Sequence, residues 1–222
     1  MVQLNDVKSM KEKKMISRFI LIAVMFMVGS SFAGDTDRQE ALRQSYLAES
    51  QKDVEGAIRS IASVYNTNPK DFFINMRMAW LNYLKGNFPV AVQHYDKAIA
   101  AQPQAVNAIA GKINVFMAQK SWKDAGKLAK DLLKLVPNDY TISMKLVTAY
   151  DGAKKYDDGV KFIDSILAHY PESTELLNYK AYFLKESGKK AQSKEVYQRV
   201  VAMSPDDAIA KNSLAEMTKA ND

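Results

Sequence analysis

The chain has 222 residues, 47% of them hydrophobic and 25% charged, a composition typical of a globular protein long enough to bury a sizeable core. It has no cysteine, so disulfides, cysteine-bound zinc, a cysteine nucleophile and a lipid-modified cysteine are all excluded. The net charge of +6, without a basic run or a groove-reading motif, gives no support to a nucleic-acid partner.

The start of the chain, over 1–33, predicts an export signal. A positively charged stretch over 11–18 precedes an unbroken apolar run over 19–28, and the small residues Ser31 and Ala33 follow. This order is typical of a secretory signal peptide, with cleavage expected after Ala33. Such a run reaches about 15 Å as a helix, roughly half of a bilayer core, which favours cleavage. The chain is therefore predicted to be periplasmic or secreted. The alternative is an uncleaved N-terminal anchor, which would be its only contact with a membrane.

Prolines divide the rest of the chain at a fixed interval. Five of the six prolines are evenly spaced: Pro69, Pro103, Pro137, Pro171 and Pro205. Their period of about 34 residues indicates stacked structural units, none of which buries its apolar face alone. After a short polar lead over 34–37, and with each proline at position 32, the five units are 38–71, 72–105, 106–139, 140–173 and 174–207. The remaining segment, 208–222, is predicted to form one helix that caps the last unit.

Each unit is predicted to hold two helices of about 13 residues joined by a short turn. In the second unit, Gly86 breaks the first helix and Pro89 lies in the first turn of the second, where its missing N–H costs little. Position 20 is small in every unit, as required where two helices approach closely: Ala57, Ala91, Ala125, Gly159 and Ser193. Polar residues able to cap the next helix follow most of the prolines: Asp71, Asp139, Ser173 and Asp206.

This pattern resembles the tetratricopeptide repeat family. The second unit matches the family pattern best, through Ala79, Gly86, Phe88, Ala91, Tyr95, Ala98 and Pro103. The first unit departs furthest, with Ser45 at position 8, and the tryptophan often found at position 4 is missing throughout. The resemblance covers residues 38–207. It implies an all-α fold, a right-handed α-solenoid of five helix-turn-helix units with a C-terminal capping helix.

The resemblance also implies where a protein or peptide would bind. First helices in this family line an inner groove, mainly through positions 2, 5, 6, 9, 12 and 13. The binding residues expected here are Tyr46, Phe73, Met76, Arg77, Trp80, Tyr83, Asn114, Met117, Met144, Lys145, Tyr179 and Tyr182, and Glu175 and Asn178 belong to the same face. Exposed aromatics and methionines suit adaptable recognition surfaces. Two alternatives are that Tyr83 and Leu84 pack on the neighbouring unit and that the segment 34–40 fills the groove.

One known binding mode of the family does not fit this sequence. Members that grip a C-terminal carboxylate pair Lys at position 5 with Asn at position 9, and no unit here has that pair. The expected ligand is therefore a helical or extended apolar segment.

No catalytic constellation stands out. The two histidines, His94 and His169, are expected at outer-face or turn positions, and there is no phosphate loop, nucleophile elbow or His-Glu-x-x-His run. The chain is predicted to be non-enzymatic, with neither cofactor nor metal. The leading hypothesis is an exported scaffold or adaptor in a bacterial envelope assembly or export system. The alternative is a structural protein that assembles end to end as a homo-oligomer.

Overall fold

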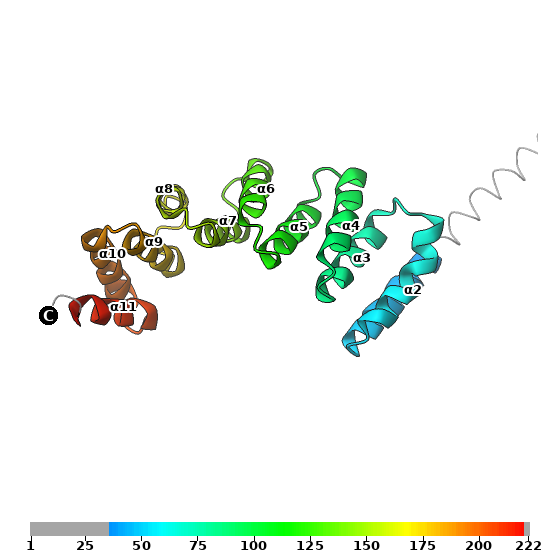
Figure 1. The fold of residues 1–222 in the computed structure, drawn as a ribbon, viewed down its shortest axis with the longest axis horizontal. Coiled ribbons are helices and arrows are strands. Elements are labelled where there is room, and N and C mark those ends of the chain that lie inside the picture. The colour runs from blue at the N-terminus through cyan, green and yellow to red at the C-terminus, as the bar shows by residue number, and fades with distance from the viewer. Residues whose placement is uncertain (1–35, 220–222) are drawn as a thin grey trace, which may run out of the picture.

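The computed structural model describes residues 36–219, which form eleven helices and no strand (Figure 1). Helix α1 covers 36–50. The helices that follow are α2 Val54–Thr67, α3 Phe72–Leu84, α4 Phe88–Ala101, α5 Val106–Ala118, α6 Trp122–Leu135, α7 Tyr140–Gly152, α8 Tyr156–Leu167, α9 Thr174–Glu186, α10 Lys190–Met203 and α11 Ala208–Lys219. The predicted signal segment lies outside the described residues. Positions 36 and 37, predicted to be part of the polar lead, are already helical.

The helix starts repeat with the period of the prolines. Helices α3, α5, α7, α9 and α11 begin at positions 72, 106, 140, 174 and 208, which are spaced as evenly as the prolines. Helices α2, α4, α6, α8 and α10 begin at positions 54, 88, 122, 156 and 190, with the same constant spacing. The unit starts deduced from the prolines therefore coincide with the starts of the first helices, from the second unit to the capping helix.

The units stack in chain order along the long axis of the molecule (Figure 1). From α2 to α11, each helix packs against the next, and α3 also contacts α5, as α5 contacts α7. The first helices thus form one layer. The buried apolar side chains fall into four clusters along the stack instead of one central core. Stability is therefore divided among neighbouring units, as expected for a solenoid.

Small residues at position 20 allow the helices to approach. Ala57, Ala91 and Ala125 are fully buried, and so is Ser193, whose hydroxyl donates to the Ala181 carbonyl at 2.7 Å. At Gly159 the ring of Phe183 lies so close that a Cβ would stand 2.4 Å from it. The sequence prediction of a close approach at position 20 is confirmed by these contacts.

The turn between the two helices of each unit contains a residue in the left-handed conformation. It always stands at position 15, with φ between 54° and 79°: Lys52, Gly86, Lys120, Lys154 and Gly188. Glycine adopts this conformation without strain, whereas a lysine there is held against a penalty of about 1 kcal/mol. The two glycines signalled this turn in the sequence, and the three lysines did not.

Side-chain caps fix the starts of most first helices. Asp71, Asp139 and Ser173 accept hydrogen bonds from the backbone N–H groups of Ile74, Ile142 and Leu176, as predicted. At α11 the prediction of Asp206 was wrong. Asp207 is the residue that caps this helix, and its Oδ1 accepts from the Ala210 N–H at 2.9 Å. Each of these caps stands at the second position after a repeat proline.

The expected position of His94 on the outer face was also wrong. His94 is buried, its ring packs edge-on against Tyr65 at 5.2 Å, and its Nδ1 lies 2.9 Å from Asn75 Oδ1. Since the Asn75 amide nitrogen donates to the carbonyls of Pro69 and Asp71, Asn75 Oδ1 faces the histidine and accepts a hydrogen bond from its Nδ1–H. Burial lowers the pKa of His94 to about 4, with Lys97 adding to the effect, so the ring is neutral at pH 7.

Within residues 36–219, no helix combines the length and the apolar character that a membrane span requires.

Candidate partner-binding face

We use "first-helix face" for the surface formed by positions 2, 5, 6, 9, 12 and 13 of the first helices. At its N-terminal end is a cavity of about 470 Å³, called here the N-terminal pocket. It is lined by Leu42, Tyr46, Glu49, Phe72, Phe73, Met76, Arg77, Trp80, Tyr95 and Asn107. Three of its aromatic side chains remain exposed to solvent: Tyr46 is 58% exposed, Phe73 53% and Trp80 38%.

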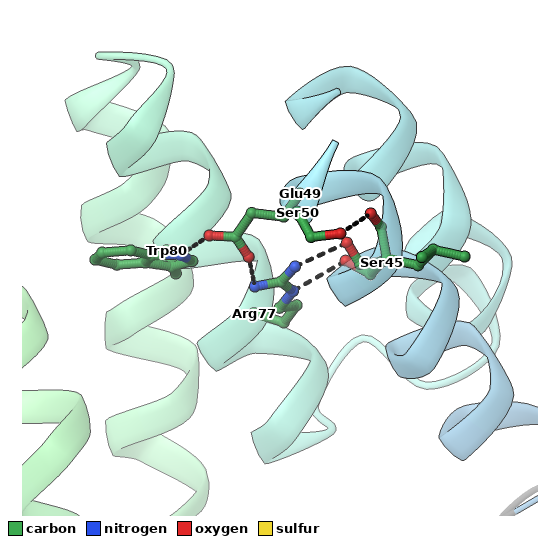
Figure 2. A network of polar contacts seen from close by, with 6 residues as sticks. Ser45, Glu49, Ser50, Arg77 and Trp80 are labelled. Carbon is green, nitrogen blue, oxygen red and sulfur yellow. Dashed lines mark hydrogen bonds and ion pairs between the residues drawn. The ribbon is translucent and has the colours of Figure 1, made fainter. Parts of the chain in front are cut away.

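A buried polar network supports this pocket (Figure 2). Arg77 on α3 is only 4% exposed, and it donates to the hydroxyl and the carbonyl of Ser45 on α1, each at 2.9 Å. Its third partner is the carboxylate of Glu49, with which it forms an ion pair. Trp80 Nε1 donates to the other Glu49 oxygen at 2.7 Å. The ring of Tyr46 lies 3.9 Å from the Arg77 guanidinium, which stacks over it.

In these contacts the charges of Arg77 and Glu49 neutralise each other. Partial burial acts to raise the pKa of Glu49, but hydrogen bonds from Trp80 and Arg77 outweigh it and hold the pKa below its usual range. Arg77 therefore fastens α1 to α3 and orients Tyr46 and Trp80, instead of presenting a free charge. What the pocket offers a ligand is mostly aromatic and aliphatic surface.

Two predicted residues connect this pocket to the core: Met76 lines the pocket, and Tyr83 lies beside Trp80. Met76 and Tyr83 are partly buried and pack against the cluster of Ala79, Ala91, Tyr95 and Val115. The Tyr83 ring lies 5.6 Å from that of Trp80 and 6.0 Å from that of Phe88. Tyr83 thus contacts Trp80 and Phe88 of its own unit, and the cluster it packs against also includes Val115 of the next unit.

The middle of the first-helix face carries the predicted residues of α5 and α7. Met117 and Met144 are partly buried against the central core cluster. Lys145 Nζ donates to Asn114 Oδ1 at 2.6 Å, which links the two helices. Lys145 is half-buried and has no carboxylate partner within residues 36–219, and burial lowers its pKa. These four residues line neither terminal pocket.

At the other end, a cavity of about 460 Å³ lies between α9 and the start of α11, called here the C-terminal pocket. Its lining residues are Thr174, Glu175, Asn178, Tyr179, Tyr182, Asp207 and Ile209. Asn178 Nδ2 donates to Asp207 Oδ2 at 3.0 Å, and Glu175 Oε2 accepts from the Tyr140 hydroxyl at 2.7 Å. Burial, followed by the hydrogen bond to Tyr156, raises the pKa of Tyr182, so its hydroxyl is neutral.

The predicted residues therefore separate into three groups along the face. Five line the N-terminal pocket, Tyr46, Phe73, Met76, Arg77 and Trp80, and Tyr179 and Tyr182 line the C-terminal pocket. The others lie between or behind them. Sequence reasoning did not identify Glu49, Asp207 or Ile209. Glu49 stands at position 12 and Ile209 at position 2, so applying the same positions to every helix would have found both.

The described residues contain no group of three or more histidine, aspartate or glutamate side chains placed to hold a metal ion.

Comparison with known proteins supports the fold. Residues 76–140 match a family model described as tetratricopeptide repeat. No curated protein matches the sequence.

Solved structures of similar shape cover most of the chain. MamA (41-end) from Desulfovibrio magneticus RS-1 has a TM-score of 0.67 at 17% identity, covering 78% of this chain and 97% of that one. A second MamA structure has a TM-score of 0.68 at 12% identity, over 78% and 94%. YrrB, described as a TPR protein with an unusual peptide-binding site, has a TM-score of 0.65 at 12% identity, over 78% and 89%. The predicted all-α solenoid of helix-turn-helix units is confirmed.

Proposed function

We propose that the protein is an exported, non-enzymatic scaffold that holds a segment of a protein partner on its first-helix face. The observation that carries the proposal is the N-terminal pocket, where three large aromatic side chains stay exposed. Trp and Tyr are the residues that most often dominate binding energy at interfaces. Exposed aromatic side chains gathered in one pocket indicate a surface that binds a partner.

The buried network makes this surface suitable for binding. Trp80 is held by Glu49, and Tyr46 stacks with Arg77, so neither ring has to be ordered when a ligand arrives. Binding to side chains that are already ordered loses less conformational entropy, which raises affinity for the same contact area. The peptide-binding site named for YrrB, a structure with the same fold, is consistent with such a use.

Site-specific cross-linking would test this proposal. A photo-cross-linking amino acid at Phe73 in the chain 34–222, exposed to an envelope extract, should capture one or a few proteins. The same amino acid at Leu135, which is exposed on a second helix, is the matched control. Trp80→Ala combined with Tyr46→Ala should abolish capture at Phe73 while the chain keeps its helical content.

Two outcomes would reject the proposal. Equal capture from Phe73 and Leu135 would mean that the first-helix face is not selective. Capture of the chain itself alone, with sedimentation showing growth with concentration, would favour end-to-end assembly as a homo-oligomer.

We further propose that the scaffold works in a bacterial envelope assembly or export system, because the order of residues 11–33 is that of a signal peptide. N-terminal sequencing of the protein recovered from the periplasm should begin at Gly34. A chain that stays with the membrane and retains its N-terminus would instead support the anchored alternative.

A further inference from the structure

The C-terminal pocket differs from a general apolar groove because two acidic side chains stand among its aromatic and aliphatic ones. Two carboxylates line it, those of Glu175 and Asp207, together with the amide of Asn178. Within residues 36–219, neither carboxylate has an ion-pair partner. Lys180, on the same helix as Glu175, is paired with Asp164 at 2.6 Å. The two carboxylates therefore accept hydrogen bonds, Glu175 from Tyr140 and Asp207 from Asn178 and the Ala210 N–H, but no cation of the described chain neutralises them.

Asn178 adds a second, independent observation. It is only 7% exposed, and its Oδ1 has no hydrogen-bond donor within the described chain. The amide orientation is fixed, because Nδ2 donates to Asp207 Oδ2 and exchanging the two atoms would place two acceptors together. A buried acceptor without a donor costs about 1–3 kcal/mol. The unsatisfied oxygen belongs to a side chain that lines the pocket and is hydrogen-bonded to Asp207.

The walls of the pocket suit a long side chain with a cationic end. Tyr179, Tyr182 and the exposed side chain of Ile209 provide apolar surface for a methylene stem. Tyrosine rings also attract cations through their faces. Tyr182 is held in place by the ring of Tyr156, whose centroid is 6.0 Å away, so this wall is preformed.

We propose that the C-terminal pocket binds a cationic side chain, arginine or lysine, of the segment held on the first-helix face. Arginine fits best, because its several N–H donors can reach Glu175 and Asp207 together while its plane stacks on a tyrosine. This inference rests on the proposed function and adds the chemistry of one anchor. The N-terminal pocket would receive an apolar side chain of the same segment.

The test uses a small probe, so it does not depend on the partner. N-acetyl-arginine methylamide is titrated into the chain 34–222, isotopically labelled on tyrosine, and NMR shifts of Tyr179 and Tyr182 report binding. The citrulline analogue, which has the same shape without the charge, should bind at least fivefold more weakly. Glu175→Gln should weaken the arginine probe to a similar extent. Glu195→Gln, which removes the same charge from an exposed position on α10, is the matched control and should change nothing.

Each alternative result overturns the proposal. Equal binding of the citrulline analogue would show that charge is not recognised. Equal losses from Glu175→Gln and Glu195→Gln would show a general electrostatic effect. Saturable shifts with Ca²⁺ alone, competing with the arginine probe, would assign the carboxylates to a metal ion. Because cross-linking at Phe73 tests the first-helix face separately, failure of the pocket and failure of the scaffold function can be distinguished.

Discussion

The two ends of the first-helix face place similar residue types in cavities of similar volume, yet they differ in how their polar groups are satisfied. In the N-terminal pocket, Glu49 is bound by Arg77 and Trp80, and the charge is neutralised beneath the surface. In the C-terminal pocket of the described chain, Asp207 and Glu175 have no cation, and Asn178 lacks a donor. The charged groups of the N-terminal pocket are paired within the chain, whereas the two carboxylates of the C-terminal pocket have no cation within the described residues.

This difference shows why a list of groove residues is not yet a description of a binding site. Arg77 and Lys145 both stand at position 6, but Arg77 has a carboxylate and a serine beside it and Lys145 has only the Asn114 amide among the described residues. The same position is structural in one unit and chemically available in another. The predictions below test whether the N-terminal end is held by its own contacts while the C-terminal end is open to a ligand.

The largest effect is expected for Arg77→Met. Removing the guanidinium leaves Glu49 partly buried without its cation and the buried Ser45 hydroxyl without its donor. Breaking one partner of such a pair typically costs about 3–5 kcal/mol. Hydrogen exchange should show loss of protection in α1 and α2, with α9–α11 unchanged, because units are stabilised by their neighbours.

The control for Arg77 is Arg59→Met, since Arg59 is exposed and its contact with Asp53 is long, at 3.6 Å. Exposed pairs of this kind contribute at most about 1 kcal/mol. Similar losses in the two variants would show that the buried network does not hold α1 in place.

Acid should weaken the N-terminal units before the C-terminal ones. His94 has a folded pKa of about 4 and an ordinary unfolded value of about 6.5, so between these values the unfolded chain binds more protons. Its contribution to stability is fully present above pH 6.5 and falls as the pH drops toward 4, by up to about 3 kcal/mol. Protonation of Glu49, which removes the ionic partner of Arg77, would act in the same direction at still lower pH.

Melting curves between pH 7 and pH 4 would measure this effect. His94→Gln keeps a hydrogen-bond donor but does not titrate, so it should flatten the pH dependence. If the melting temperature of His94→Gln falls with pH as steeply as that of the unmodified chain, groups other than His94 cause the acid sensitivity.

Two buried asparagines provide a matched comparison of the two ends. Asn75 uses its whole amide, on Pro69, Asp71 and His94, whereas Asn178 has one hydrogen bond and one unpartnered acceptor within the described chain. Asn75→Ala should cost about 2 kcal/mol, because it leaves buried groups unpaired. Asn178→Ala should cost less, under about 1 kcal/mol, because it also removes an unpaired acceptor. Chemical denaturation of both variants checks the ranking, and equal losses would mean that Asn178 is not short of a donor.

The sequence was sufficient to predict the solenoid because its determinants are local. The proline period, the small residue at position 20 and the cap at the second position after each proline are properties of single units, repeated. That same period would have selected Asp207 over Asp206 as the last cap. The pairing of Arg77 with Ser45 and Glu49, and the burial of His94 by Asn75 and Tyr65, join residues of different helices. Such pairs depend on how helices pack within a unit and between neighbouring units, which the residue type at one position does not specify.

The smallest effects are expected in the turns between the two helices of a unit. Lys154 holds a φ of 54° where Gly188, at the same position of the next unit, holds 79°. Lys154→Gly removes the left-handed penalty but increases the conformational entropy of the unfolded chain, so the net gain should be at most about 0.5 kcal/mol. Gly188→Ala should destabilise by about 1 kcal/mol, although a Cβ there would meet no neighbouring atom. A Cβ at Gly188 would clash with no neighbour, so any loss must come from the backbone conformation. An unchanged free energy of unfolding for Gly188→Ala would show that backbone conformation does not decide the stability of these turns.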